Sequence, residues 1–131
     1  MTNDILYITW DEFEQGAKDI ARQVARHMHD NHIRFTTIYG VPRGGLVLAV
    51  RLSYLLGIPL LHEPNKITTT TLVVDDSTVT GKTLKNFCNK YNNKTAVFVH
   101  KPDTSIFTPD FICKTTTKTV NYSWEAYDDR N

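Results

Sequence analysis

The chain has 131 residues, 40% of them hydrophobic and 22% charged, and its 15 Lys and Arg nearly balance 14 Asp and Glu to give a net charge of +1. These values are typical of one globular domain with a modest core, so we expect a single domain over residues 1–131. The near-neutral charge argues against a general nucleic-acid or membrane-surface binder. No apolar run approaches the roughly 20 residues that a membrane span needs.

The amino terminus and the cysteines indicate the expected compartment. Residues 1–4 are polar and include an acid, which is not typical of a secretory signal. Cys88 and Cys113 lie far apart, and no Cys-x-x-Cys pair occurs. Free thiols in a reducing environment are therefore expected, which favours a cytoplasmic location.

The first predicted element is an amphipathic helix of about 20 residues. Thr9 and Glu12 have the spacing of a capping box at its start. The helix is expected to end near Asp30-Asn31. Apolar residues recur along it at helical spacing: Phe13, Ala17, Ile20, Ala21, Val24 and Met28.

Short apolar strands and two further helices follow in alternation. The expected helices cover residues 46–56, closed by Gly57, and about 81–91. The expected strands and β-like segments lie at 35–39, 58–61, 71–74, 95–100, 111–113 and 119–122. This order predicts an α/β fold with a mostly parallel twisted sheet flanked by helices. Residues 128–130 (Asp-Asp-Arg) are expected to form an exposed tail.

Ligands of such sheets bind beyond the carboxyl ends of the strands. Two glycine-bearing loops, at residues 40–45 and 75–81, follow predicted strands here. The second contains Asp75 and Asp76 and leads into Thr-Gly-Lys-Thr at 80–83, where backbone N–H groups at a helix start can bind an anion. A plain helix cap after a buried strand would also account for this segment taken alone.

The two acids narrow the possible anions. A P-loop needs glycine five residues before its Gly-Lys pair, and Asp76 occupies that position, so a P-loop nucleotide site is disfavoured. Two carboxylates would repel a bound phosphate unless a sugar with free hydroxyls or a hydrated Mg²⁺ lay between them. The pattern therefore favours a site for a ribose 5-phosphate group.

The segment Val73–Thr83 resembles the PRPP-binding motif of type I phosphoribosyltransferases: a hydrophobic strand, two acids, three variable residues and Thr-Gly-x-Thr. In that family the acids hold the ribose hydroxyls and the Thr-Gly loop surrounds the 5-phosphate. The resemblance implies that Asp75 and Asp76 are catalytic and bind Mg²⁺. It assigns the ribose 5-phosphate to Asp75, Asp76, Ser77, Thr78, Val79, Thr80, Gly81, Lys82 and Thr83.

A second segment, Tyr39–Leu46, resembles the pyrophosphate loop of the same family. It implies that Arg43, Gly44 and Gly45 bind the leaving pyrophosphate, with Arg43 as a further catalytic residue. A Gly-Pro turn before a helix would account for this segment alone. Its occurrence together with the first motif favours the functional interpretation.

The resemblance to small bacterial xanthine-guanine and hypoxanthine phosphoribosyltransferases extends over nearly the whole chain. It implies a small C-terminal hood over the base and a base pocket made by Lys101, Val120, Trp124 and Glu125. Lys101 would donate to the exocyclic oxygen of a purine, although a solvated strand end is the alternative. Trp124 either contacts the base or packs within the hood.

Three features depart from the pattern of these enzymes. Val79 stands where many of them carry Asp, and Thr119 stands where an aromatic ring usually stacks on the base, which leaves Tyr122 or Trp124 as substitutes. The lid that should close over the reaction is restricted to residues 62–70. This loop is short for a lid that excludes water.

The sequence therefore predicts a Mg²⁺-dependent phosphoribosyltransferase of nucleotide salvage. It would transfer ribose 5-phosphate from PRPP to a nitrogenous base, with a purine favoured, and release pyrophosphate. A non-catalytic PRPP- or nucleotide-binding protein of the same fold and a pyrimidine or orotate phosphoribosyltransferase stay open as alternatives. The expected partners are these small molecules and further copies of the chain, since a small domain gains from association, with neither nucleic acid nor membrane.

Overall fold

The computed structural model describes residues 4–125, so the tail predicted at 128–130 lies outside the described residues. None of the helices in this range is long and apolar enough to cross a membrane. The elements in chain order are β1 (Ile5–Ile8), α1 (Trp10–Asn31), β2 (Thr37–Gly40), α2 (Gly44–Leu56), β3 (Leu60–Leu61), the 3-10 turn η1 (Pro64–Lys66), β4 (Thr71–Thr78), α3 (Lys82–Tyr91), β5 (Thr95–His100), β6 (Phe111–Thr115) and β7 (Thr119–Tyr122).

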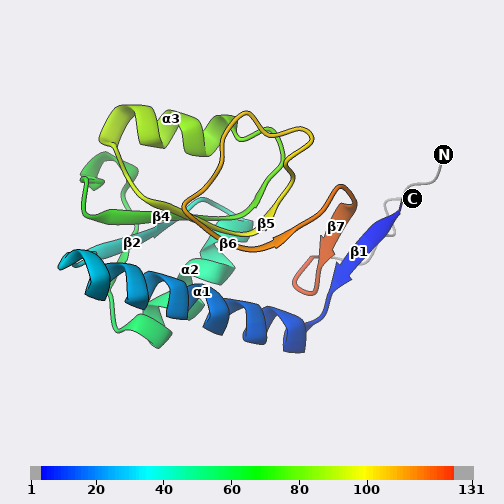
Figure 1. Ribbon diagram of the computed structural model, residues 1–131, viewed down its shortest axis with the longest axis horizontal. Coiled ribbons are helices and arrows are strands. Elements are labelled where there is room, and N and C mark those ends of the chain that lie inside the picture. Colours follow the sequence, from blue (N-terminus) through cyan, green and yellow to red (C-terminus); the bar gives the residue numbers. More distant parts are fainter. Residues whose placement is uncertain (1–3, 126–131) are drawn as a thin grey trace.

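Five of the strands form one sheet in the order β3-β2-β4-β5-β6, and every neighbouring pair is parallel. Helices α1 and α2 cover one face of this sheet and α3 covers the other (Figure 1). Alternation along β4 serves both faces: Leu72 and Val74 belong to the core cluster under α1 and α2, whereas Val73 belongs to the cluster with Leu84 of α3. The predicted α/β class with a parallel sheet is confirmed.

The hood is a separate two-stranded sheet in which β1 pairs with β7 in parallel, with Ile5 opposite Thr119 and Ile8 opposite Tyr122. It lies at one end of the molecule (Figure 1). The sequence did not predict β1, and the hood is therefore built from the two ends of the described chain rather than from the C-terminal segment alone.

The capping box and the apolar spacing predicted the position of α1 correctly. Its capping box is present: the Glu12 N–H donates to Thr9 Oγ1 at 3.1 Å and the Thr9 N–H donates to Glu12 Oε1 at 3.0 Å. Other boundaries differ from the prediction. Helix α2 begins at Gly44, two residues early, and β4 continues through the acids to Thr78, because β5 supplies a partner strand along this polar stretch.

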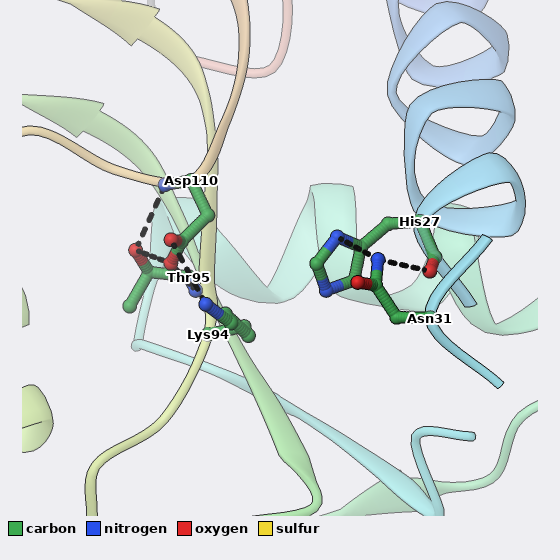
Figure 2. A network of polar contacts seen from close by, with 5 residues as sticks. All are labelled: His27, Asn31, Lys94, Thr95 and Asp110. Atoms are coloured by element: carbon green, nitrogen blue, oxygen red, sulfur yellow. Dashed lines mark hydrogen bonds and ion pairs between the residues drawn. The ribbon is translucent and has the colours of Figure 1, made fainter. Parts of the chain in front are cut away.

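Polar side chains join the amino-terminal ends of neighbouring strands, and Figure 2 shows those of Lys94, Thr95 and Asp110 at the start of β5. Asp110, just before β6, accepts the Thr95 N–H at 2.8 Å and forms an ion pair with Lys94 at 3.8 Å. The hydroxyls of Thr37 and Thr71, the first residues of β2 and β4, lie 2.9 Å apart in a hydrogen bond. Polar groups at this edge therefore stabilise the sheet itself.

Candidate active site

The two predicted motifs meet at the carboxyl ends of β2 and β4. These strands are neighbours with Gly40 opposite Val74, and the Val41 N–H donates to the Val74 carbonyl at 2.8 Å. A Cβ on Gly44 would overlap Asp76 Oδ2, and a Cβ on Gly45 would lie 2.6 Å from the Val74 carbonyl oxygen. The glycines therefore allow the loop after β2 to lie directly against the acids.

The acids sit half-buried near the end of β4. The Oδ1 atom of Asp75 accepts the Asp76 N–H at 2.8 Å, and Asp76 Oδ1 accepts the Ser77 N–H at 2.7 Å. Burial, and after it the hydrogen bonding and charge of Asp76, raise the pKa of Asp75 well above its usual range. Bringing a cation or a hydroxyl-rich ligand between these carboxylates would relieve their repulsion.

The donor set fits a magnesium ion that arrives with its substrate. Mg²⁺ is usually held by one or two carboxylates together with waters and substrate phosphates. Within residues 4–125 no group of three or more His, Cys, Asp or Glu side chains is placed to hold a metal. Asp75 and Asp76 offer two carboxylates, so PRPP would have to supply further oxygens.

Behind the acids lies a cavity of about 210 Å³, lined by residues 75–81, 83 and 84. Gly81 precedes α3 with φ 78°, a left-handed conformation that favours glycine, and a Cβ there would overlap Ser105 Oγ. The first turn of α3 follows directly, so its N–H groups lie at this cavity. Most of the residues predicted for the 5-phosphate therefore line one cavity, which the start of α3 adjoins.

Two of the predicted nest residues use their hydroxyls elsewhere. Ser77 Oγ is bonded to the Tyr122 hydroxyl at 2.5 Å, and Thr78 Oγ1 to His100 Nδ1 at 2.6 Å. Thr78 is buried, at 2% exposed. These residues can therefore offer only backbone groups to a phosphate, whereas the side chains of Thr80 and Thr83 are exposed.

A second cavity of about 810 Å³ joins the pyrophosphate loop, the acids and the hood. Arg43, exposed at the start of α2, forms no ion pair with any residue between 4 and 125. The lining residues are Pro42, Arg43, Gly44, Val47, Asp75, Asp76, Trp124 and Glu125. Some of the residues predicted for pyrophosphate, for ribose and for the base thus line one shared space.

Two of the four predicted base-pocket residues do not line this space among the described residues. Val120 packs against the main core cluster. Lys101 is half-buried directly after β5, and its N–H donates to the Thr78 carbonyl at 3.1 Å, which places its backbone beside the nest strand. Trp124 and Glu125 do border the cavity.

Tyr122 has a structural role that the sequence did not indicate. It is only 3% exposed, and its hydroxyl donates to the Asp76 carbonyl at 2.8 Å as well as bonding Ser77. Its ring stacks on Trp124 at 4.5 Å, and burial raises the pKa of its phenol. Tyr122 therefore ties the hood to the acid strand and is not available as a platform for the base. Trp124 borders the larger cavity and also packs against Tyr122 and Phe13.

Hydrogen bonds hold the loop at residues 62–70, which occupies the position of the lid. The Tyr91 hydroxyl donates to the Pro64 carbonyl at 3.3 Å, and Asn93 Nδ2 donates to the Thr68 carbonyl at 2.6 Å. Within the loop, Ile67 is buried at 5% exposed. Residues 62–70 are thus hydrogen-bonded to the end of α3 and to the segment before β5, and none of them lines either of the two cavities described above.

Comparison with known proteins identifies the family. No family model and no curated protein matches the sequence. Among solved structures, a purine phosphoribosyltransferase from Pyrococcus horikoshii is 30% identical, with a TM-score of 0.77 over 95% of this chain and 96% of its own. The chain belongs to the type I phosphoribosyltransferase family.

Two more distant structures share the fold. The xanthine-guanine-hypoxanthine phosphoribosyltransferase of Helicobacter pylori has a TM-score of 0.76 at 17% identity over 95% of each chain. A hypothetical protein from Neisseria gonorrhoeae with bound ppGpp has a TM-score of 0.73 at 17% identity over 98% of this chain and 93% of its own. The architecture therefore persists across widely different sequences.

Proposed function

We propose that this protein is a Mg²⁺-dependent phosphoribosyltransferase that transfers ribose 5-phosphate from PRPP to a purine base and releases pyrophosphate. One observation carries the proposal: the Arg43–Gly45 loop lies directly against Asp75 and Asp76, because Gly44 has no Cβ to displace the Asp76 carboxylate. Sites for the two ends of PRPP thereby adjoin one another. The 30% identity to a purine phosphoribosyltransferase supports the acceptor class.

The reaction proposed is displacement at the anomeric carbon through a sugar with cationic character. Such a transition state depends on positioning and electrostatic stabilisation more than on covalent catalysis. Asp75 and Asp76 would orient the ribose hydroxyls and offset the growing positive charge. Mg²⁺, when bound with PRPP, would offset part of the pyrophosphate charge.

Binding energy away from the reacting bond would hold the substrate. The N–H groups at the start of α3, with Thr80 and Thr83, would anchor the 5-phosphate, and Arg43 with the Gly44 N–H would hold the departing pyrophosphate. At the hood end of the cavity, Trp124 would cover the base, and Lys101 is assigned as donor to its exocyclic oxygen.

The test is pyrophosphate release from Mg²⁺-PRPP with guanine, xanthine, hypoxanthine, adenine and orotate supplied singly. The proposal predicts turnover with at least one purine and none with orotate. Turnover with orotate alone would instead select the pyrimidine enzyme. Absence of release with every base would refute a catalytic role on these acceptors.

A second candidate is a non-catalytic PRPP- or nucleotide-binding protein. The observation that favours it is that Tyr91 and Asn93 donate hydrogen bonds to carbonyls of the loop at residues 62–70. A loop held in this way is poorly placed to exclude water from the sugar. Calorimetry with PRPP, IMP, GMP and ppGpp would support this candidate if one of them bound tightly while no base gave pyrophosphate release.

A further inference from the structure

The segment of residues 101–107, between β5 and β6, reaches the loop that joins β4 to α3 (Figure 1). The segment is closed into a turn, because the N–H groups of Thr104 and Ser105 donate to the Lys101 carbonyl at 3.3 and 3.0 Å. A Cβ on Gly81 would overlap Ser105 Oγ. The turn and the loop are therefore in direct contact.

Backbone hydrogen bonds join the segment to the loop at two points. The Lys101 N–H donates to the Thr78 carbonyl at 3.1 Å. The Ile106 N–H donates to the Thr80 carbonyl at 2.8 Å. These two bonds do not depend on side chains, and they leave the carbonyl between them, that of residue 79, to a further donor.

A side chain supplies that donor. Thr104 Oγ1 donates to the Val79 carbonyl at 2.5 Å. Both residues are exposed, so water would satisfy this carbonyl if the hydroxyl were removed, and the loss should cost little stability. What the bond does fix is the orientation of the peptide group between residues 79 and 80.

Holding a carbonyl also orients the N–H group of the same peptide unit. In a trans peptide, as in this loop, the two groups point in opposite directions. The three held carbonyls therefore turn the N–H groups of Val79, Thr80 and Gly81 away from the segment. Within residues 4–125, none of these three N–H groups donates to another residue.

The free N–H groups belong to residues that line the cavity assigned to the 5-phosphate. Residues 79–81 border this space of about 210 Å³, whereas no residue of the 101–107 segment does. The segment and the cavity thus lie on different sides of the loop. Successive N–H groups at a concave surface can bind an anion, and ordering them before binding removes part of the entropic cost.

We propose that Thr104 is a positioning residue for the 5-phosphate: its hydroxyl holds the peptide group between Val79 and Thr80 so that the N–H groups of the loop face the cavity. This rests on the proposed function, which assigns the cavity to the 5-phosphate. Thr104 acts through the loop and does not itself contact the substrate. It lies outside the motif at residues 73–83, so the motif alone does not indicate it.

Calorimetric titration with ribose 5-phosphate tests the proposal without an acceptor base or pyrophosphate release. Thr104→Val keeps the shape of the side chain and removes its donor, so ribose 5-phosphate should bind about fivefold more weakly. Thr104→Ser keeps the hydroxyl and should bind like the wild type. Thr108→Val, the same change at an exposed threonine outside the segment, is the matched control and should also bind like the wild type.

A second ligand separates positioning from a general disturbance of the site. Mg²⁺-pyrophosphate, assigned to the loop at residues 43–45, should bind Thr104→Val as tightly as the wild type. Circular dichroism checks that each variant is folded. In turnover, KM for PRPP should rise about fivefold in Thr104→Val with kcat within about twofold, because only substrate binding is weakened.

The outcomes distinguish this proposal from the enzymatic one. Weaker ribose 5-phosphate binding in Thr104→Val but not in Thr104→Ser, in a protein that releases no pyrophosphate with any base, would support the positioning role and refute the transferase. Unchanged ribose 5-phosphate binding in Thr104→Val would overturn the positioning role alone. Equal losses in Thr104→Val and Thr104→Ser, an equal loss of pyrophosphate affinity, or a wild type that does not bind ribose 5-phosphate would overturn it as well.

Discussion

The two ends of the five-stranded sheet use polar residues in opposite ways. At the amino ends, polar groups bond one another: Thr37 with Thr71, and Thr95 with Asp110. At the carboxyl ends, Asp75 and Asp76 are forced together beside a cavity instead.

The contrast separates residues that hold the fold from residues that can hold a ligand. Thr95 is fully buried with its partners in place, and that arrangement lowers the free energy of the folded state. Asp75 instead carries a cost, because burial and the neighbouring Asp76 disfavour its charged form and raise its pKa. We expect a ligand to stabilise residues that lie in a cavity at such a cost to the free energy of the folded state.

The largest expected effect comes from converting the two acids at the carboxyl ends of the strands to amides, compared with the same change at the amino ends. Asp75→Asn combined with Asp76→Asn should lower the rate of pyrophosphate release at least about 10³-fold, because charge is removed where the transition state needs it. Asp110→Asn, the same change at the other end, should leave the rate within about twofold and lower stability by about 1 kcal/mol. A fully active double variant would refute the assignment of the site.

Gly44→Ala should have the next largest effect. The new Cβ would overlap Asp76 Oδ2 and push the pyrophosphate loop off the acids. We expect kcat/KM for PRPP to fall about 10²-fold, since a small misplacement of binding groups is costly. Gly57→Ala is the control: its Cβ meets open space, and its φ of 67° costs only stability, about 1 kcal/mol. Equal kinetic losses in both would show that the loop–acid contact is unimportant.

Tyr122→Phe should have a smaller effect, on stability. It removes the hydroxyl that joins the hood to Ser77 and to the Asp76 carbonyl while keeping the ring packed on Trp124. Leaving those buried partners without their bonds should cost about 1–3 kcal/mol in urea unfolding. An unchanged unfolding midpoint would mean that the hood is held by ring packing alone.

The smallest effect concerns the α1–α2 contact, which belongs to neither end of the sheet. Hydrogen bonding to Arg51, with its charge, lowers the pKa of Glu14 from 4.5 to about 2. A lowered folded-state pKa stabilises the fold above the unfolded pKa, and that contribution is lost as pH falls from about 4.5 toward 2. The free energy of unfolding, measured in urea, should therefore fall more between pH 6 and pH 3 for the wild type than for Glu14→Gln. Parallel pH profiles for the two proteins would contradict this.

Much of the fold could be predicted because its signals are local. The Thr9–Glu12 capping box and the apolar spacing after it gave α1, and strong apolar runs gave the core strands. Strand β1 was missed because its partner β7 lies almost a chain length away. Strand β4 was ended too early because Asp75–Thr78 are polar, and pairing with β5 keeps them extended.

The two motifs of the candidate site could be predicted because their signals are also local. The residues that the hood contributes could not, because their placement depends on contacts between distant parts of the chain. The two glycine-bearing motifs are continuous in sequence, and the structure brings them together as expected. Residues contributed by the hood depend on tertiary packing. Tyr122 was considered for the base but is buried against the acid strand, and Val120 is partly buried against the core cluster. Pairing with β1 orients β7, and the sequence of β7 alone does not show this.

The most direct test of the account is calorimetric titration of Mg²⁺-PRPP into three proteins: the wild type, Asp75→Asn/Asp76→Asn and Asp110→Asn. It needs no acceptor base and therefore examines the carboxyl-end site alone. The account predicts one PRPP per chain for the wild type and for Asp110→Asn, and at least tenfold weaker binding to the double variant. Equal binding to all three proteins, or none to the wild type, would contradict it.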